Sequence, residues 1–115
     1  RTGVPFGVSS IAQAAAIASL DAADELAGRV AAVAAERDRV TLALRALGYA
    51  VPRSQANFVW LRTTDAGREQ LLSAFDAADI LVRGYAGDGV RVTIADAASN
   101  DRVIRVLAGL AQAAA

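Results

Sequence analysis

The alternation of hydrophobic and polar positions predicts two helices in the first part of the chain. Ser9 or Ser10 can cap the alanine-rich run SSIAQAAAIASL, which predicts a short helix with a narrow apolar face suited to close packing. Apolar residues then recur at spacings of three and four, which predicts a longer helix that reaches about Leu47. Asp21 is expected to cap this helix. Gly48 should end that helix in a left-handed conformation.

Two extended segments follow the second helix. The run YAVP, residues 49–52, is bounded by glycine and proline and predicts an edge strand at best. The run ANFVWLRT, residues 56–63, is rich in aromatic and β-branched residues and apolar on both faces. A strand of that kind is typical of the middle of a sheet, so we expect residues 56–63 to form the central strand.

The remainder of the chain predicts a helix, a hairpin and a final helix. Thr64 or Asp65 can cap a helix through Ala78. The runs ILVR and GVRVTIA lie on either side of the glycine-rich turn GYAGDG, and they should pair as an antiparallel hairpin. The run DAASN then supplies caps for a last helix with an apolar stripe.

This order of elements predicts an α+β fold. The simplest architecture that buries every apolar stripe is a two-layer small domain, in which a mostly antiparallel sheet packs against helices. We expect a single domain over residues 1–115, with an irregular opening segment over residues 1–8 that contains Gly3, Pro5 and Gly7. The chain begins with arginine and contains no methionine, which indicates that it is part of a longer protein.

Charge and hydropathy argue against two classes of partner. The 12 basic and 12 acidic residues are scattered and balance, and aromatic residues make up only 5% of the chain, so nothing indicates nucleic-acid binding. No apolar run approaches the roughly 20 residues that span a bilayer, and no leader opens the chain, so we expect no membrane partner and a cytoplasmic location.

The absent residue types limit the chemistry of this chain. Cysteine and histidine are missing, which removes thiolate and imidazole catalysis and the usual zinc ligands, so we predict no metal site. All 12 basic residues are arginine, so no lysine can form a Schiff base. We therefore expect this chain alone to be catalytically inactive.

Two arginines of the predicted hairpin are the candidates for a binding site. Arg83 ends one strand and Arg91 lies early in the other, so both guanidinium groups can lie near one end of the sheet. If they share a face, they form a pocket for a carboxylate or phosphate. The alternative is that both are solvated, or that they pair with Asp79, Asp88 or Asp96.

Four other polar or aromatic residues have simpler interpretations. Asn57 is expected to satisfy local backbone at the start of its strand. Phe58 and Trp60 are expected in the core, where the indole N–H needs a partner. Phe6 lies outside the regular elements, and it either fills a core or reaches a neighbouring surface.

The chain contains three linked stretches: PFGVSSIAQAAAIASLDAADEL, SQANFVWL and ILVRGYAGDGVRVTIADAASND. In this order and spacing they closely resemble the C-terminal part of the histidinol-phosphate and aromatic amino acid aminotransferases. These are class I/II, fold-type-I pyridoxal-phosphate enzymes, and the match is closest to the aromatic (phenylalanine) branch. The resemblance implies the C-terminal small domain of a homodimeric aminotransferase, which transfers an amino group from an aromatic amino acid to a 2-oxo acid.

The resemblance also implies roles for individual residues. Arg91 would be the arginine that binds the substrate carboxylate, Arg83 a second cation lining the same site, and Phe6 part of a segment near the active site and the dimer interface. The catalytic lysine and most residues that bind pyridoxal phosphate would lie upstream of this chain. After the strand that contains GVRVT, family members often have glycine and threonine, whereas this chain reads IADAASND. The loop that leaves this strand is therefore expected to differ.

Three alternatives to this function remain open at this point. The substrate could be histidinol phosphate instead of an aromatic amino acid. The chain could also be a free-standing α+β module that binds an amino acid through the same two arginines, or an interaction domain that binds no small ligand.

Overall fold

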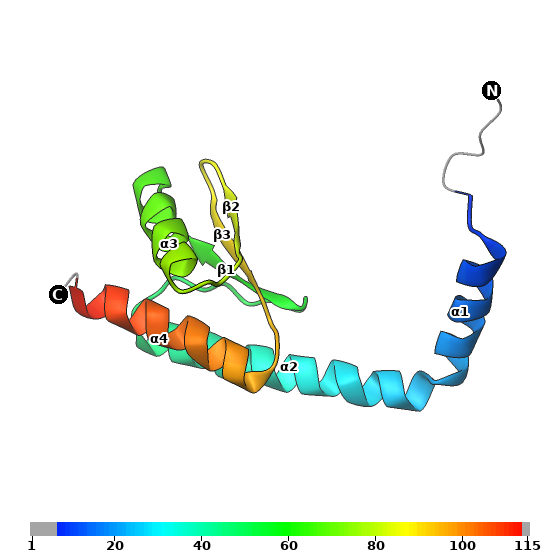
Figure 1. Cartoon of the computed structure of the whole chain (residues 1–115). Coiled ribbons are helices and arrows are strands. Elements are labelled where there is room, and N and C mark those ends of the chain that lie inside the picture. Colours follow the sequence, from blue (N-terminus) through cyan, green and yellow to red (C-terminus); the bar gives the residue numbers. More distant parts are fainter. Residues whose placement is uncertain (1–6, 114–115) are drawn as a thin grey trace, which may run out of the picture. The chain divides into compact units, whose positions relative to one another are not determined.

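The structure, a computed structural model, describes residues 7–113 (Figure 1). Its elements are α1 (Ser10–Asp21), α2 (Ala23–Ala46), β1 (Phe58–Arg62), α3 (Asp65–Ala77), β2 (Arg83–Tyr85), β3 (Gly89–Thr93) and α4 (Ala97–Ala113). The chain divides into two compact units, residues 1–31 (unit 1) and residues 32–115 (unit 2). The predicted α+β class is confirmed. Most of the expected opening segment lies outside the described residues.

The first helix begins where the sequence predicts and ends later than expected. The N–H of Ala12 donates to the Ser9 side chain at 3.2 Å, which confirms the cap of α1. The expectation that Asp21 caps the second helix is wrong, because Asp21 is the last residue of α1. The N–H of Ala22 still donates to the carbonyl of Ala18 at 3.2 Å, so the helical hydrogen bonding runs on past Asp21.

Gly48 terminates α2 by a Schellman motif. Its φ is +88°, a conformation that glycine adopts without strain. The N–H of Gly48 donates to the carbonyl of Arg45 at 3.0 Å, and the N–H of Tyr49 donates to that of Leu44 at 3.1 Å. These bonds satisfy two of the last carbonyls of the helix, so the predicted stop is confirmed.

The apolar stripe of α2 is buried only toward its C-terminal end. Val40 and Leu44 lie in the core of unit 2. Leu26 and Val30, which continue the same stripe in the first turns, are exposed. The regular spacing predicted which face of α2 is apolar, but it did not predict the residue at which this face becomes buried.

Residues 49–52 do not form the edge strand that the pattern allowed. Val51 is buried, and its carbonyl accepts hydrogen bonds from the Nε and Nη2 of Arg45 at 2.9 and 2.7 Å. An arginine side chain therefore occupies the acceptor that a neighbouring strand would use, while Pro52 has no N–H to donate.

The sheet is antiparallel throughout and has the order β1-β3-β2. The hairpin of β2 and β3 is confirmed, although β2 begins at Arg83 and not at Ile80. The prediction that residues 56–63 form the central strand is wrong, because β1 is at an edge and β3 pairs on both sides.

One face of the sheet forms the core with the helices of unit 2. Val59, Leu61, Val90 and Val92 point toward this layer. The helices α2, α3 and α4 supply the facing side chains: Val40, Leu44, Leu71, Phe75, Val103 and Leu107. The final helix lies alongside the second half of α2 (Figure 1), where the hydroxyl of Tyr49 donates to the carbonyl of Leu107 at 2.8 Å. The two-layer arrangement agrees with the prediction.

A buried amide joins α2 to the loop that follows β3. Asn100 is 2% exposed, and its side chain accepts from the N–H of Ala95 and donates to the carbonyl of the same residue, at 3.1 and 2.9 Å. It also donates to Glu36 at 3.0 Å. The hydrogen bonds from Arg39 and Asn100 lower the pKa of Glu36. This network holds the end of the central strand against α2.

The last helix has the cap that the sequence predicts. Asp96 accepts hydrogen bonds from the N–H and the hydroxyl of Ser99, at 3.0 and 2.7 Å. These bonds lower the pKa of the Asp96 carboxyl. None of the helices within residues 7–113 combines the length and the apolar character needed to cross a membrane.

Candidate functional site

The two arginines of the hairpin lie directly opposite each other. Arg83 on β2 pairs with Arg91 on β3, and Arg91 in turn pairs with Trp60 on β1. Residues opposite each other in antiparallel strands project from the same face of the sheet. Since Val90 and Val92 point into the core, Arg91 and its two partners project from the other face, away from the helices. The two guanidinium groups therefore share a face, as one of the two interpretations required.

Aromatic rings surround these guanidinium groups. The Cζ of Arg91 lies 5.6 Å from the ring centroid of Phe58, and the Cζ of Arg83 lies 5.4 Å from that of Tyr85. Both distances are within the range of a cation–π interaction. The ring centroids of Trp60 and Tyr85 lie 5.3 Å apart, and the two ring planes form an angle of 52°. The outer face of the sheet thus carries Arg83 and Arg91 beside three aromatic rings, and Arg62 projects from the same face at the end of β1.

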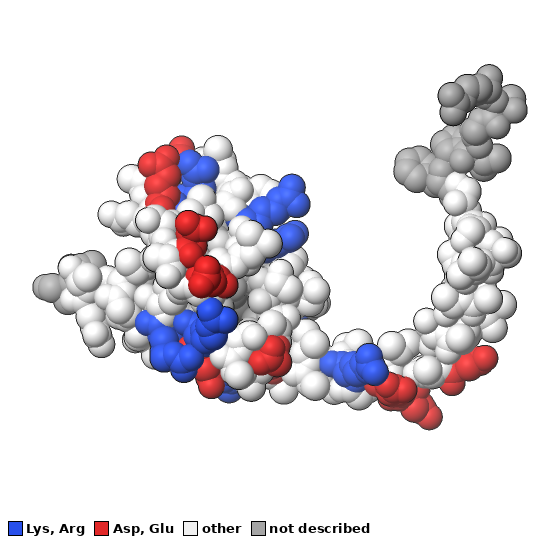
Figure 2. Space-filling model, viewed as in Figure 1, with Lys and Arg blue, Asp and Glu red and all other residues white. Residues whose placement is uncertain are grey.

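No carboxylate neutralises this pair within residues 7–113. No ion pair or side-chain hydrogen bond involves Arg83 or Arg91 there, and Asp96 is used to cap α4. Figure 2 shows basic side chains gathered over the strand region of unit 2, apart from the acidic side chains there. The alternative in which these arginines pair with Asp79, Asp88 or Asp96 is therefore not found in the described part of the chain, and the alternative in which they are solvated on the open face remains.

The chemistry of this arrangement suits an anion. Arginine presents several N–H donors in a plane, which suits a bidentate contact with a carboxylate. Two such groups on one face, with aromatic rings beside them, suit an anion attached to an apolar or aromatic body. The described residues contain no cluster of acidic side chains able to hold a metal ion.

Several predicted residues have a different environment from the one expected. Phe58 and Trp60 are only partly buried, because Val59 and Leu61 occupy the core-facing positions of β1. Asn57 is exposed and its side chain forms no hydrogen bond within the described residues, while its carbonyl accepts from the N–H of Ile94 at 2.8 Å. Phe6, the third predicted site residue, lies outside the described residues.

Sequence reasoning missed Tyr85. It was assigned to the turn, whereas it belongs to β2 and its ring contacts Arg83. The spacing of two residues between Arg83 and Tyr85 was the available signal, since residues i and i+2 of a strand share a face.

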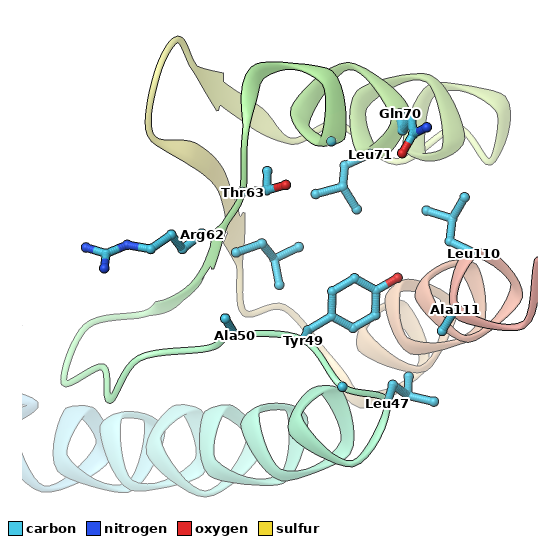
Figure 3. A pocket seen from close by; sticks show the side chains of 12 residues that line it. Leu47, Tyr49, Ala50, Arg62, Thr63, Gln70, Leu71, Leu110 and Ala111 are labelled. Atoms are coloured by element: carbon cyan, nitrogen blue, oxygen red, sulfur yellow. The ribbon is translucent and has the colours of Figure 1, made fainter. Parts of the chain in front are cut away.

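A cavity of about 420 Å³ lies elsewhere in unit 2, between the end of α2, the start of α3 and the end of α4. In Figure 3, Tyr49, Leu71 and Leu110 point into this space, whereas the guanidinium group of Arg62 points away from it. Neither Arg83 nor Arg91 lines it. The cavity is therefore separate from the Arg83–Arg91 pair.

Comparison with known proteins identifies related chains. Residues 1–108 match the family model described as aminotransferase class I and II. An aromatic amino acid aminotransferase from Streptomyces coelicolor is 55% identical over 108 residues, which cover 92% of this chain and 29% of that relative. One from Mycobacterium ulcerans is 58% identical over 102 residues, which cover 89% of this chain and 28% of that relative.

A solved structure supports the same relationship. The crystal structure of a candidate aminotransferase from Burkholderia pseudomallei superimposes with a TM-score of 0.72 and 33% sequence identity. The match covers 82% of this chain and 30% of that one. The chain therefore spans less than a third of the length of the relatives described here.

Proposed function

The chain belongs to the class I and II aminotransferase family, and on this premise we propose that it is the C-terminal small domain of a pyridoxal-phosphate aminotransferase acting on aromatic amino acids. The observation that carries the proposal is the pair of arginines that share the outer face of the sheet without a carboxylate partner in residues 7–113. The domain's part in the reaction is to bind and orient the substrate.

In this proposal Arg91 binds the α-carboxylate of the amino acid. Arg91 lies on the central strand, which is paired on both sides and held at its end by Asn100, so its backbone is the better anchored of the two. A bidentate contact would fix both the position and the rotation of the carboxylate, and with them the direction of the Cα–H bond. Arg83, on the edge strand, is exposed and serves as a second cation at the rim of the same site.

No residue of this chain can hold the cofactor covalently, because the chain has no lysine. When bound, pyridoxal phosphate supplies the carbonyl chemistry by which an amino group is removed and returned. The residues present fit the substrate's anion, so most cofactor-binding groups would belong to the remainder of the longer protein. The 115-residue chain alone is then expected to be inactive.

Exposed apolar side chains support a longer protein. Among the described residues, α1 contains no buried residue, and an isolated helix of 12 residues is marginal in water. Large hydrophobic side chains are exposed just before α1, along α1 and at the start of α2: Val8, Ile11, Ile17, Leu20, Leu26 and Val30. Such a surface needs a partner. We propose that it packs against parts of the enzyme outside this chain, including the second subunit of a cytoplasmic homodimer.

The identity of the substrate rests on two observations. The named relatives are aromatic amino acid aminotransferases, and Phe58, Trp60 and Tyr85 surround the arginine pair. Histidinol phosphate is the second candidate, because the exposed guanidinium group of Arg83 could bind its phosphate.

The test uses the longer protein encoded by the complete reading frame. We expect it to transfer the amino group of phenylalanine or tyrosine to 2-oxoglutarate, with a higher kcat/KM than for histidinol phosphate. The 115-residue chain in parallel should show no turnover. A reading frame without an upstream lysine-bearing cofactor domain would contradict the proposal, and would favour a free-standing amino-acid-binding module.

A further inference from the structure

The ring of Phe58 lies beside the guanidinium group of Arg91. Phe58 pairs with Thr93 and is therefore the diagonal neighbour of Arg91 on the outer face of the sheet. Its ring centroid lies 5.6 Å from the Cζ of Arg91. Within residues 7–113 no ion pair or side-chain hydrogen bond holds this guanidinium group, so the ring is the one cation-binding contact found for it.

The position of Phe58 is itself well held. The hydroxyl of Ser54 donates to the carbonyl of Phe58 at 2.7 Å and accepts from the N–H of Ala56 at 3.2 Å. The N–H of Ile94 donates to the carbonyl of Asn57 at 2.8 Å, so the start of β1 is tied to the end of β3. The ring is thus presented from a fixed backbone.

We propose that Phe58 is a positioning residue for Arg91, because its ring orients the guanidinium group while leaving every N–H donor available to the substrate carboxylate. This inference rests on the proposed function. A neighbouring Asp or Glu would also orient the arginine, but it would occupy donors and neutralise the charge. An aromatic face attracts the cation without accepting any of its conventional hydrogen bonds. The arginine can then remain ordered before substrate arrives, which lowers the entropy lost on binding.

The chain offers a matched control in the second arginine–aromatic pair. Tyr85 contacts Arg83 at 5.4 Å, a separation close to that between Phe58 and Arg91. The substitutions Phe58→Leu and Tyr85→Leu each remove one ring and keep an apolar side chain. If the effect depends on Arg91, only the first should strongly alter binding of the α-carboxylate.

The experiment measures competitive inhibition of the full-length enzyme by 3-phenylpropionate and by its neutral analogue 3-phenylpropanol. We expect Phe58→Leu to weaken inhibition by the carboxylate about 3- to 30-fold, the range that a cation–π contact of this kind corresponds to. Inhibition by the alcohol should stay within about twofold. Phe58→Tyr should retain carboxylate binding, and Tyr85→Leu should have a smaller effect than Phe58→Leu.

A double-mutant cycle separates positioning from simple packing. If Phe58 acts through Arg91, Phe58→Leu should add little to Arg91→Ala. Equal weakening of both inhibitors, or additive effects of the two substitutions, would overturn the inference while leaving the proposed function intact. An active wild-type enzyme in which Arg91→Ala has no effect would overturn both the inference and the assigned role of Arg91. A full-length protein without transaminase activity would instead contradict the proposed function, and with it this inference.

Discussion

Arg83 and Arg91 are cross-strand partners on the uncovered face of the sheet, and no carboxylate within residues 7–113 lies between or beside them at ion-pairing distance. Like charges opposite each other on neighbouring strands destabilise a sheet. The arrangement therefore reduces the stability of the folded state in the absence of an anion, and a bound anion would relieve the repulsion.

This relationship predicts that Arg83→Gln relieves a repulsion of roughly 0.2–1 kcal/mol at low ionic strength, a gain in the free energy of unfolding that the lost cation–π contact with Tyr85 partly offsets. The gain should shrink as phosphate is added, because the anion stabilises only the wild-type pair. Urea denaturation at several phosphate concentrations measures both effects. The control is Arg105→Gln on the exposed side of α4, which should show no phosphate dependence of this kind. Equal behaviour of the two variants would rule out repulsion between the hairpin arginines.

Asn100 should be the most sensitive polar position in unit 2. Replacing it with alanine leaves the N–H and the carbonyl of Ala95 without their side-chain partner and removes one of the two hydrogen bonds to Oε1 of Glu36, which Arg39 still binds. A lost partner in a buried site costs about 1–3 kcal/mol, so we expect a decrease in unfolding free energy of about 2 kcal/mol. Asn57→Ala, at an exposed position, should change it by less than about 0.5 kcal/mol. Denaturation curves for the two variants that coincide would contradict this account of the buried amide.

The pKa of Glu36 predicts a dependence of stability on pH. Hydrogen bonds from Arg39 and Asn100 lower this pKa in the folded state, so the charged carboxylate stabilises the protein above its unfolded pKa, about 4.3. That contribution is lost as the pH falls through the lower, folded value. Unfolding free energies measured from pH 6 down to pH 3 should therefore fall less steeply in Glu36→Gln and in Arg39→Gln. An unchanged slope in both variants would show that the ion pair contributes nothing.

The backbone of Gly48 provides a test of the helix stop. Its φ of +88° is unfavourable for residues with a Cβ, so Gly48→Ala should destabilise unit 2 by about 1 kcal/mol. Gly109 lies on the exposed side of α4 with no neighbouring atom within 4 Å of an added Cβ. Gly109→Ala should therefore stabilise the helix by about 0.5–1 kcal/mol. Thermal or urea unfolding of the pair should give shifts of opposite sign, and shifts of the same sign would refute the interpretation.

Local chemistry made much of this fold predictable. Ser9, Thr64 and Asp96 cap helices where the sequence predicts, since a side-chain oxygen satisfies nearby N–H groups without help from the rest of the chain. The stop at Gly48 and the β2–β3 hairpin also depend mainly on residues close in sequence.

The errors arose where distant residues decide the outcome. The edge position of β1 depends on which strands pair, and the aromatic residues that suggested a central strand lie beside the arginines on the outer face. At Val51, a side chain from α2 occupies the carbonyl that a strand would have used.

The candidate site was predictable only in part. The sequence predicts that Arg83 and Arg91 lie on a hairpin. Whether they project from the same face depends on the register of the two strands, which changes with the length of the turn. The contribution of Tyr85 could not be foreseen while it was assigned to the turn, and Phe6 lies outside the described residues.

The central claim is that Arg91 binds the substrate carboxylate, and kcat/KM for phenylalanine in the full-length enzyme tests it most directly. Arg91→Ala should lower this quantity by about 100-fold or more, a loss of roughly 3 kcal/mol of transition-state stabilisation. Arg83→Ala should cause a much smaller decrease. A value for Arg91→Ala equal to that of the wild type, in an enzyme that transaminates phenylalanine, would contradict the claim.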